Sequence, residues 1–215
     1  MVALEPCGKD AVGPGVTALQ IGLRVFVSAR ELAQRGGCYA EAICVPKSAP
    51  FVLPDAIRFE DAVSLGNFRL ALAMLSSNGN QPARSILIRG AASGVATALV
   101  QVTRDRGPRV IGTASAPEKR DFALANGVHE VIESYPQGLI AMLIQLTGGR
   151  GVDRAFDHFG GDLLVACQRS LAPFGMLVSY NIVHGLPTGD VFEELRLLLG
   201  KQPGRAHLFD PRHRR

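Results

Sequence analysis

The stretch from Ile86 to Glu133 constrains the fold more than any other part of the chain. It contains two near-continuous apolar runs, at 86–89 and 109–113, separated by a turn of small residues and a segment with helical spacing. A strand, a small-residue turn, a helix and a second strand in this order predict a parallel βαβ unit. Small residues let a ligand approach backbone N–H groups at a helix N-terminus, where the dipole favours negative charge. The order therefore predicts the first half of a dinucleotide site.

The turn is a loosened form of the GxGxxG fingerprint. Ala91, Ser93 and Ala96 stand where the three glycines would be, and a small-residue turn can equally serve tight packing. The position of the turn between a predicted strand and a predicted helix favours the functional interpretation. The residues that we expect to hold the pyrophosphate are Ala91, Ala92, Ser93, Gly94, Val95 and Ala96.

The end of the second strand indicates which dinucleotide fits. A NAD-type site carries Asp or Glu about 20 residues further on, where it holds the ribose 2′-hydroxyl. Here the strand ends in Thr113, Ala114 and Ser115, without a carboxylate. Lys119 and Arg120 follow, and a hydroxyl with a cation suits a 2′-phosphate, so we expect NADP(H) held by Ser115 and Lys119. The alternative is that both cations are solvated residues in the first turn of a helix, although cations are mildly unfavourable there.

From residue 85 onward, predicted strands and helices alternate. The strands are near-continuous apolar runs, which is typical of a parallel sheet covered on both faces. The alternation predicts an α/β fold with a Rossmann-type doubly wound sheet, whose ligand crevice lies at the carboxyl ends of the strands. We expect strands at 86–89, 109–113, 129–132, 153–157 and 175–180, and helices at 94–106, 117–126, 137–147, 162–171 and 191–199.

Two later strand ends supply further candidates. Phe159 and Gly160 follow the fourth predicted strand, and Asn181 follows the fifth. Glycine after a strand lets the backbone approach a ribose or a nicotinamide, although any sharp turn uses it too. We expect Phe159, Gly160 and Asn181 to contact the cofactor, and the hydride to leave near Phe159 and Asn181. His158 and His184 are interpreted as structural. A Ser-His-Asp order, an HExxH motif and a carboxylate pair are absent from the sequence, so no catalytic residue is assigned.

The first 58 residues have a different character. They are rich in Gly, Pro and Val, with short apolar runs that predict strands at 23–27 and 39–45 and an extended proline-rich connector after them. Residues 59–80 predict a connecting helix because apolar residues recur there at helical spacing. The chain is therefore expected to divide into a β domain at 1–58, a helix at 59–80 and a Rossmann domain at 81–215.

Composition excludes several classes of protein. The net charge of +4 is diffuse and forms no Lys/Arg stripe interleaved with aromatic residues, so nucleic-acid binding is not expected. No apolar run reaches about 18 residues, so no transmembrane helix is expected. The four cysteines are scattered and form no CxxC pair, which argues against a zinc knuckle or a redox dithiol. Isolated cysteines of this kind predict reduced thiols in a cytoplasmic protein.

Short motifs along nearly the whole chain share the order and spacing of one known family. They are Ala11 to Thr17, Gly22 to Val25, Gly37 to Glu41, Val45-Pro46, Leu53 to Asp55, Gly90 to Ala96, Thr113 to Lys119, Phe156 to Gly161 and Leu171 to Ser179. In these motifs the chain resembles the medium-chain dehydrogenase/reductase superfamily, in its zinc-free quinone oxidoreductase branch. The resemblance implies a GroES-like β domain before the Rossmann domain, NADPH as cofactor, hydride transfer to a quinone or an α,β-unsaturated carbonyl, no metal, and a homodimer.

The chain departs from this family at both ends and inside. The resemblance begins partway into the GroES-like domain and stops before the helix that the family returns to it, so both domains are expected to be truncated. Asn181 stands where the family has glycine. A second interpretation therefore stays open beside an NADPH-dependent reductase. It is a truncated or degenerate relative that binds nucleotide, or only a partner protein, without turnover.

Overall fold

The computed structural model describes residues 2–4, 12–14, 16–28, 40–77, 82–133, 138–199 and 207–208. The chain separates into two compact units, Met1–Leu70 and Ala71–Arg215. The division falls inside helix α2 (Leu65–Ser76), which follows the short helix α1 (Phe59–Ala62). Both helices lie in the 59–80 segment that the sequence predicts to be helical, of which residues 78–80 lie outside the described part.

The first unit contains a small antiparallel sheet in the order β1-β2-β3, formed by β1 (Val2–Leu4), β2 (Val25–Val27) and β3 (Pro50–Val52). The side chain of Arg24 fastens the segment after β3, because its Nη1 donates to the carbonyls of Pro54 and Asp55 at 3.1 Å each. The core of this unit consists of Phe26, Leu53 and Ala62, with Ile57 and Phe59 packed against them.

Two expectations for the first unit are wrong. The sequence predicts a strand at 39–45, but residues 40–45 form none, and neither does Pro46 after them. Tyr39 lies outside the described residues. Most of this segment is exposed, so no neighbouring strand buries it. The expected connector instead contains β3, which begins at Pro50. Proline is tolerated as the first residue of a strand because the ladder does not need its missing N–H there.

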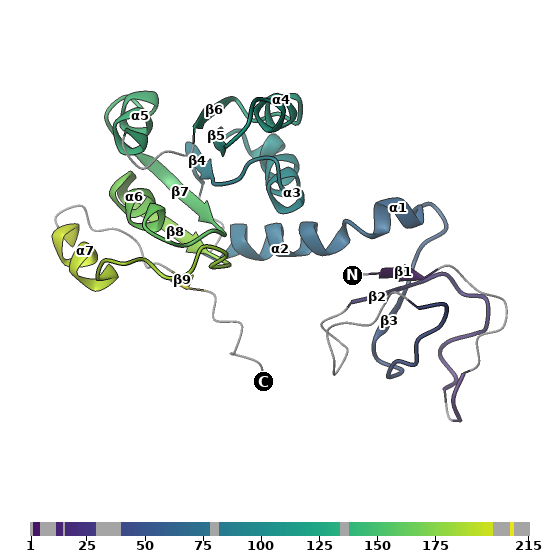
Figure 1. Ribbon diagram of the computed structural model, residues 1–215. Helices are drawn as coiled ribbons and strands as arrows, with labels where there is room; N and C mark the ends of the chain where they lie inside the picture. Colours follow the sequence, from purple (N-terminus) through teal and green to yellow (C-terminus); the bar gives the residue numbers. More distant parts are fainter. Residues whose placement is uncertain are drawn as a thin grey trace. The chain divides into compact units, whose positions relative to one another are not determined.

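In the second unit, six described strands form a parallel sheet in the order β6-β5-β4-β7-β8-β9. This is the Rossmann order, in which the first strand lies at the centre and the chain winds outward in both directions. The expected doubly wound parallel sheet is therefore confirmed (Figure 1). The strands are β4 (Ser85–Ile88), β5 (Arg109–Ala114), β6 (Glu130–Glu133), β7 (Val152–Asp157), β8 (Leu171–Ser179) and β9 (His207–Leu208).

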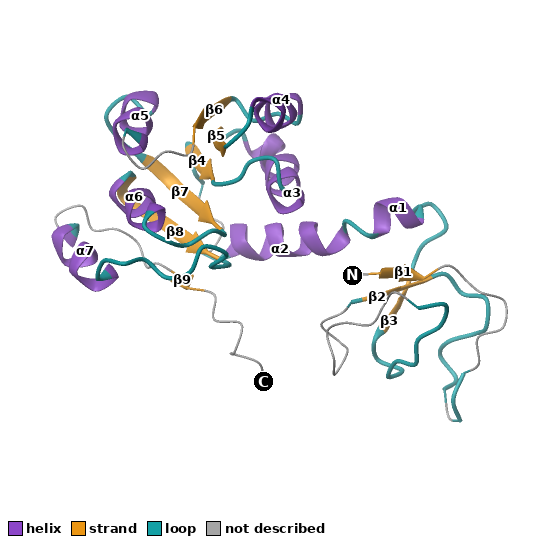
Figure 2. Ribbon diagram, in the orientation of Figure 1, coloured by secondary structure: helices purple, strands orange, loops and turns teal. Residues whose placement is uncertain are grey.

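Helices alternate with these strands, as Figure 2 shows. Helices α3 and α4 lie on one side of the sheet, and α5 and α6 lie on the other (Figure 1). None of the helices in the described part of the chain combines the length and the apolar character that crossing a membrane requires. The helices are α3 (Gly94–Thr103), continued by the 3-10 turn η2 (Arg104–Arg106), α4 (Pro117–Ala125), α5 (Leu139–Leu146), α6 (Leu163–Arg169) and α7 (Val191–Leu197).

Strand β8 begins four residues before the expected start at 175, since it starts at Leu171. Its register against β7 shifts between Val152 and Arg154, and Phe174 adopts a positive φ of 62° at this irregularity. A bulge of this kind interrupts the side-chain alternation from which a strand is recognised. The sequence pattern therefore locates only the regular part of β8.

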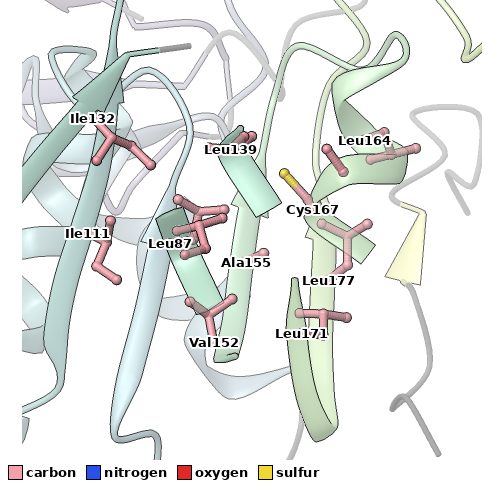
Figure 3. Close-up of a cluster of buried hydrophobic side chains, with 12 residues drawn as sticks. Leu87, Ile111, Ile132, Leu139, Val152, Ala155, Leu164, Cys167, Leu171 and Leu177 are labelled. Carbon is pink, nitrogen blue, oxygen red and sulfur yellow. The ribbon is translucent and has the colours of Figure 1, made fainter. Parts of the chain in front are cut away.

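One face of the parallel sheet packs on α5 and α6 to form the core of the second unit. Leu87, Ile111 and Ala155 contribute from the central strands, and Leu143 and Leu164 contribute from the helices. All five are buried, as the near-continuous apolar strands require. Figure 3 shows this cluster, which also contains Ile132, Leu139, Val152, Ala166, Cys167, Leu171 and Leu177.

Candidate cofactor-binding site

The turn between β4 and α3 is fixed by hydrogen bonds to the neighbouring strand. The N–H of Gly90 donates to Thr113 Oγ1 at 3.2 Å, and the N–H of Ala91 donates to the Thr113 carbonyl at 2.9 Å. Ser93 then caps α3, because its Oγ accepts a hydrogen bond from the N–H of Ala96 at 3.2 Å. The cap satisfies one of the N–H groups that a helix start leaves without an intrahelical partner. Backbone N–H groups at a helix start of this kind favour an anion.

The small residues of the fingerprint divide into two groups in the structure. Ala91 and Ala96 are buried, with 1% and 0% of their surface exposed. A Cβ added at Gly112 on β5 would lie 2.5 Å from the Cβ of Ala91, so the strand and the turn fit together without room for a larger residue. Ala91 and Ala96 therefore pack beneath the turn, whereas Ala92 and Ser93 face the cavity beside it.

A cavity of about 490 Å³ opens at the carboxyl ends of β4, β5 and β7. Of the predicted contacts, Ala92, Ser93, Ser115, Lys119 and Phe159 line this cavity. Ala91, Gly94, Val95, Ala96, Gly160 and Asn181 do not. The described residues that line it are Arg89, Gly90, Ala92, Ser93, Thr113, Ala114, Ser115, Lys119, His158, Phe159, Leu163 and His184.

The two cations that follow β5 have different surroundings. Lys119 lines the cavity together with Ser115, and no residue described as lining the cavity is acidic. Arg120 instead forms an ion pair with Glu133 at the end of β6, with Nη2 at 3.1 Å from Oε1. Helix α4 begins after Ala116, whose side chain makes no capping hydrogen bond. Ser115 and Lys119 therefore line the same cavity, although the first turn of α4 also carries the acidic Glu118, which is not among the lining residues.

Aromatic rings from the β7–α6 turn and from the segment after β8 form an aromatic wall of the cavity. The ring centroids of His158 and Phe159 lie 3.8 Å apart, and Phe159 stacks on His184 at 4.9 Å. Tyr180 also contacts this wall, since its hydroxyl lies 3.4 Å from His158 Nδ1. Burial lowers the pKa of His158 and raises the pKa of Tyr180, so both side chains are neutral near pH 7.

His158, His184 and Arg89 also line the cavity, although no sequence motif marks them as contacts. An isolated histidine carries no motif, and only the folded turn shows that the rings of both histidines share one wall with Phe159. Arg89 follows an apolar strand and carries no motif either. The signal that could have located them is position, since all three follow strands at the edge where a doubly wound sheet binds ligands.

Gly160 and Asn181 have packing and turn roles in the structure. Gly160 has φ of +70°, and a Cβ added there would lie 2.4 Å from the carbonyl oxygen of Gly185. Asn181 Oδ1 accepts a hydrogen bond from the N–H of Ile182 at 2.9 Å. Phe159 therefore shares the cavity of Ser115 and Lys119, whereas Asn181 lies outside it, beyond the end of β8.

Comparisons with known proteins agree with this architecture. The family model described as zinc-binding dehydrogenase matches residues 94–203. A human synaptic vesicle membrane protein VAT-1 homolog is 34% identical over 177 residues, covering 81% of this chain and 43% of the relative. A quinone oxidoreductase of Pseudomonas aeruginosa is 30% identical over 182 residues, covering 84% of this chain and 55% of the relative. The chain thus spans about half the length of these curated relatives.

A solved structure of a quinone oxidoreductase also matches this chain. The structure of Escherichia coli quinone oxidoreductase complexed with NADPH matches with a TM-score of 0.76 and 28% identity, covering 92% of this chain and 60% of that one. The fold and the cavity at the strand ends define a dinucleotide-binding type of protein. The chain belongs to the zinc-binding dehydrogenase family, within the quinone oxidoreductase-like branch of the medium-chain dehydrogenase/reductase superfamily.

The name of this family raises the question of a zinc site. Zinc is held by three or four Cys, His, Asp or Glu side chains that converge on one point. In the described part of the chain, no three such side chains come together in a way that could hold a metal ion. The described residues therefore do not fit a zinc ion.

Proposed function

We propose that this chain binds NADPH in the cavity at the ends of β4, β5 and β7, and that the protein transfers hydride to a quinone or an α,β-unsaturated carbonyl. The observation that carries the proposal is the shared position of Ser115 and Lys119. Both line the same cavity as the capped start of α3, and no acidic residue is described in the lining. A cation and a hydroxyl favour a 2′-phosphate, and an acid would favour the 2′-hydroxyl of NADH.

The residues present fit the parts of the cofactor in order. The start of α3 suits the pyrophosphate, because the N–H groups of Gly94 and Val95 lie in its first turn. The N–H of Ala96, by contrast, already donates to the Ser93 hydroxyl. Lys119 and Ser115 suit the 2′-phosphate at the end of β5. The flat rings of His158 and Phe159 offer an apolar wall for the adenine base.

Bound NADPH would supply the hydride, so the protein has to bind, orient and shield it. With the 2′-phosphate at the end of β5 and the adenine base against the rings that follow β7, the nicotinamide half would extend past the start of α3 toward the end of β8. Asn181 follows β8 and is our candidate on that side. Phe159 shares the cavity with Lys119, so we place it at the adenosine half rather than beside the hydride.

The acceptor is proposed from the relatives. The Pseudomonas aeruginosa and Escherichia coli proteins are quinone oxidoreductases, and the latter was solved with NADPH. A quinone and an α,β-unsaturated carbonyl both accept hydride at an electron-poor carbon or oxygen, so one arrangement can serve both. A GroES-like character of the first unit, a homodimer, a zinc-independent reaction and a cytoplasmic location belong to the same proposal.

The test is a titration of the purified protein with NADPH and with NADH, followed by nicotinamide fluorescence. Tighter binding of NADPH is expected, and absence of binding to either nucleotide would overturn the proposal. A second step adds 1,4-benzoquinone or an enone and follows loss of NADPH absorbance. Binding without NADPH oxidation would instead support a relative that binds nucleotide without turnover.

A further inference from the structure

Arg89 is a charged side chain that the fold buries at the edge of the cavity. It follows β4, and only 2% of its surface is exposed. Its Nη1 donates to Asp157 Oδ1 at 2.5 Å and to the carbonyl of Gly160 at 3.3 Å. Asp157 is the last residue of β7 and is fully buried. Removing two charges from water is costly, so a buried pair of this kind is kept only when its geometry and its further hydrogen bonds are good.

Asp157 extends the pair into the turn after β7. Its Oδ1 accepts a hydrogen bond from the N–H of Phe159 at 3.3 Å, and its Oδ2 accepts one from the N–H of Gly160 at 2.9 Å. The pair therefore fixes both polar backbone groups of Gly160. The guanidinium carbon of Arg89 also lies 5.1 Å from the centroid of the Phe159 ring, within the range of a cation–π contact. The backbone and the aromatic side chain of the turn are thus held from β4.

The rings that this turn carries lie directly against the backbone of the β4–α3 turn. Gly90 has φ of +68°, and a Cβ added there would lie 2.7 Å from Cε1 of His158 and 2.8 Å from Cε2 of Phe159. Both rings line the cavity. A small displacement of the β7–α6 turn would therefore move the wall of the cavity relative to the start of α3.

One donor of Arg89 remains unused. Its Nε–H is buried and has no hydrogen-bond acceptor among the described residues. A buried pair that served only stability would be expected to satisfy each of its donors, because an unpaired buried N–H is unfavourable. Arg89 also lines the cavity, so the pair lies where the turn after β7 meets the space for a ligand.

We propose that the Arg89–Asp157 pair positions the His158–Phe159 wall against the adenosine side of the cavity and thereby sets the affinity for the adenosine half of the cofactor. Both are positioning residues, because they act through the turn after β7. The identity of the ligand rests on the proposed function. The mechanical part, that the pair holds the turn, does not depend on any ligand.

The experiment uses the double variant Arg89→Met/Asp157→Leu, which removes the pair without leaving an unpaired charge. The matched control is Arg154→Met. Arg154 is also a buried arginine, but it lies on β7 and does not line the cavity. The first readout is hydrogen exchange without ligand at the Phe159 and Gly160 amides. The second is the Kd of 2′,5′-ADP, which carries only the adenosine half. We expect the double variant to exchange at least tenfold faster and to bind at least tenfold more weakly, while the control stays within twofold of the wild type.

The two proposals can fail separately. A wild-type protein that does not bind 2′,5′-ADP would overturn the proposed function, and hydrogen exchange would still decide whether the pair holds the turn. Unchanged exchange in the double variant would overturn the positioning role, and faster exchange with unchanged affinity would overturn its link to binding. Should the double variant not fold, Arg89→Lys serves instead. Lysine keeps the charge but lacks the planar fork of arginine, so faster exchange at the same two amides is expected.

Discussion

At the scale of single residues, Gly90 combines two constraints that can be separated by experiment. It has φ of +68°, and its Cα faces the rings of His158 and Phe159. Gly107 has a similar φ of +72°, but nothing lies within 4 Å of an added Cβ. Alanine at Gly107 should therefore cost about 1 kcal/mol of unfolding free energy from backbone strain alone. Alanine at Gly90 should cost a further 1–3 kcal/mol, roughly, because the rings have to move. Urea unfolding of the two variants measures this difference, and equal losses would contradict the close fit.

Cys167 provides a second prediction at this scale. It lies on the buried face of α6, and burial raises the pKa of its thiol to about 12. A thiol with this pKa stays protonated at pH 8 and is a poor nucleophile. We expect Cys167 to remain unmodified by iodoacetamide in the native protein while the exposed Cys44 reacts, as peptide mapping by mass spectrometry would show. Native modification of Cys167 at the rate of Cys44 would mean that the core opens readily.

At the scale of elements, the start of α3 carries the pyrophosphate in our account, and Ser93 allows capping and ligand binding to be separated. Replacing Ser93 with Ala removes the hydrogen bond to Ala96 and should lower the unfolding free energy by about 1 kcal/mol. Ser93→Asp keeps a capping oxygen and places a negative charge at the helix start, so stability should be retained. The same charge would repel a pyrophosphate, and the Kd for NADPH should rise at least tenfold. Wild-type affinity in Ser93→Asp would show that the pyrophosphate binds elsewhere.

The elements of the second unit could be predicted from the sequence with good accuracy. Its central strand β4 is an apolar run after Ser85, and Ile86, Leu87 and Ile88 are all buried, so the hydrophobic pattern and the burial coincide there. The first unit is harder to predict, because its strands have only three residues each. Strand β3 also begins at Pro50, and proline indicates a connector rather than a strand. Short strands carry too few alternations for a period to be recognised.

The candidate site could be predicted only where it depends on local sequence. Ser93, Ser115 and Lys119 follow directly from the βαβ pattern, and they line the cavity. The aromatic wall depends on the turn after β7, whose position is set by hydrogen bonds between Asp157, Arg89 and Gly160. Arg89 and Asp157 are 68 positions apart in the chain, and no local pattern connects them.

At the scale of the whole molecule, the order of the strands explains why the cavity lies where it does. The chain leaves the central strand β4 toward β5 and β6, and it later continues from β7 toward β8 and β9 on the other side. The connections diverge at β4 and β7, and this switch point leaves a crevice outside the carboxyl ends of the strands. The capped helix, Lys119 and the aromatic wall reach the crevice from three different strands. Binding therefore depends on the assembled sheet rather than on the fingerprint turn alone.

The central claim is that this cavity holds a 2′-phosphate, and the ratio of the NADH and NADPH dissociation constants tests it most directly. The ratio is measured by nicotinamide fluorescence for the wild type, for Lys119→Ala and for Arg120→Ala, the control whose cation pairs with Glu133. We predict that the wild type prefers NADPH and that Lys119→Ala weakens NADPH at least tenfold, about 1.4 kcal/mol. NADH binding in Lys119→Ala, and both nucleotides in Arg120→Ala, should change less than twofold. Equal loss of NADPH and NADH in Lys119→Ala, or a wild type that prefers NADH, would contradict the account.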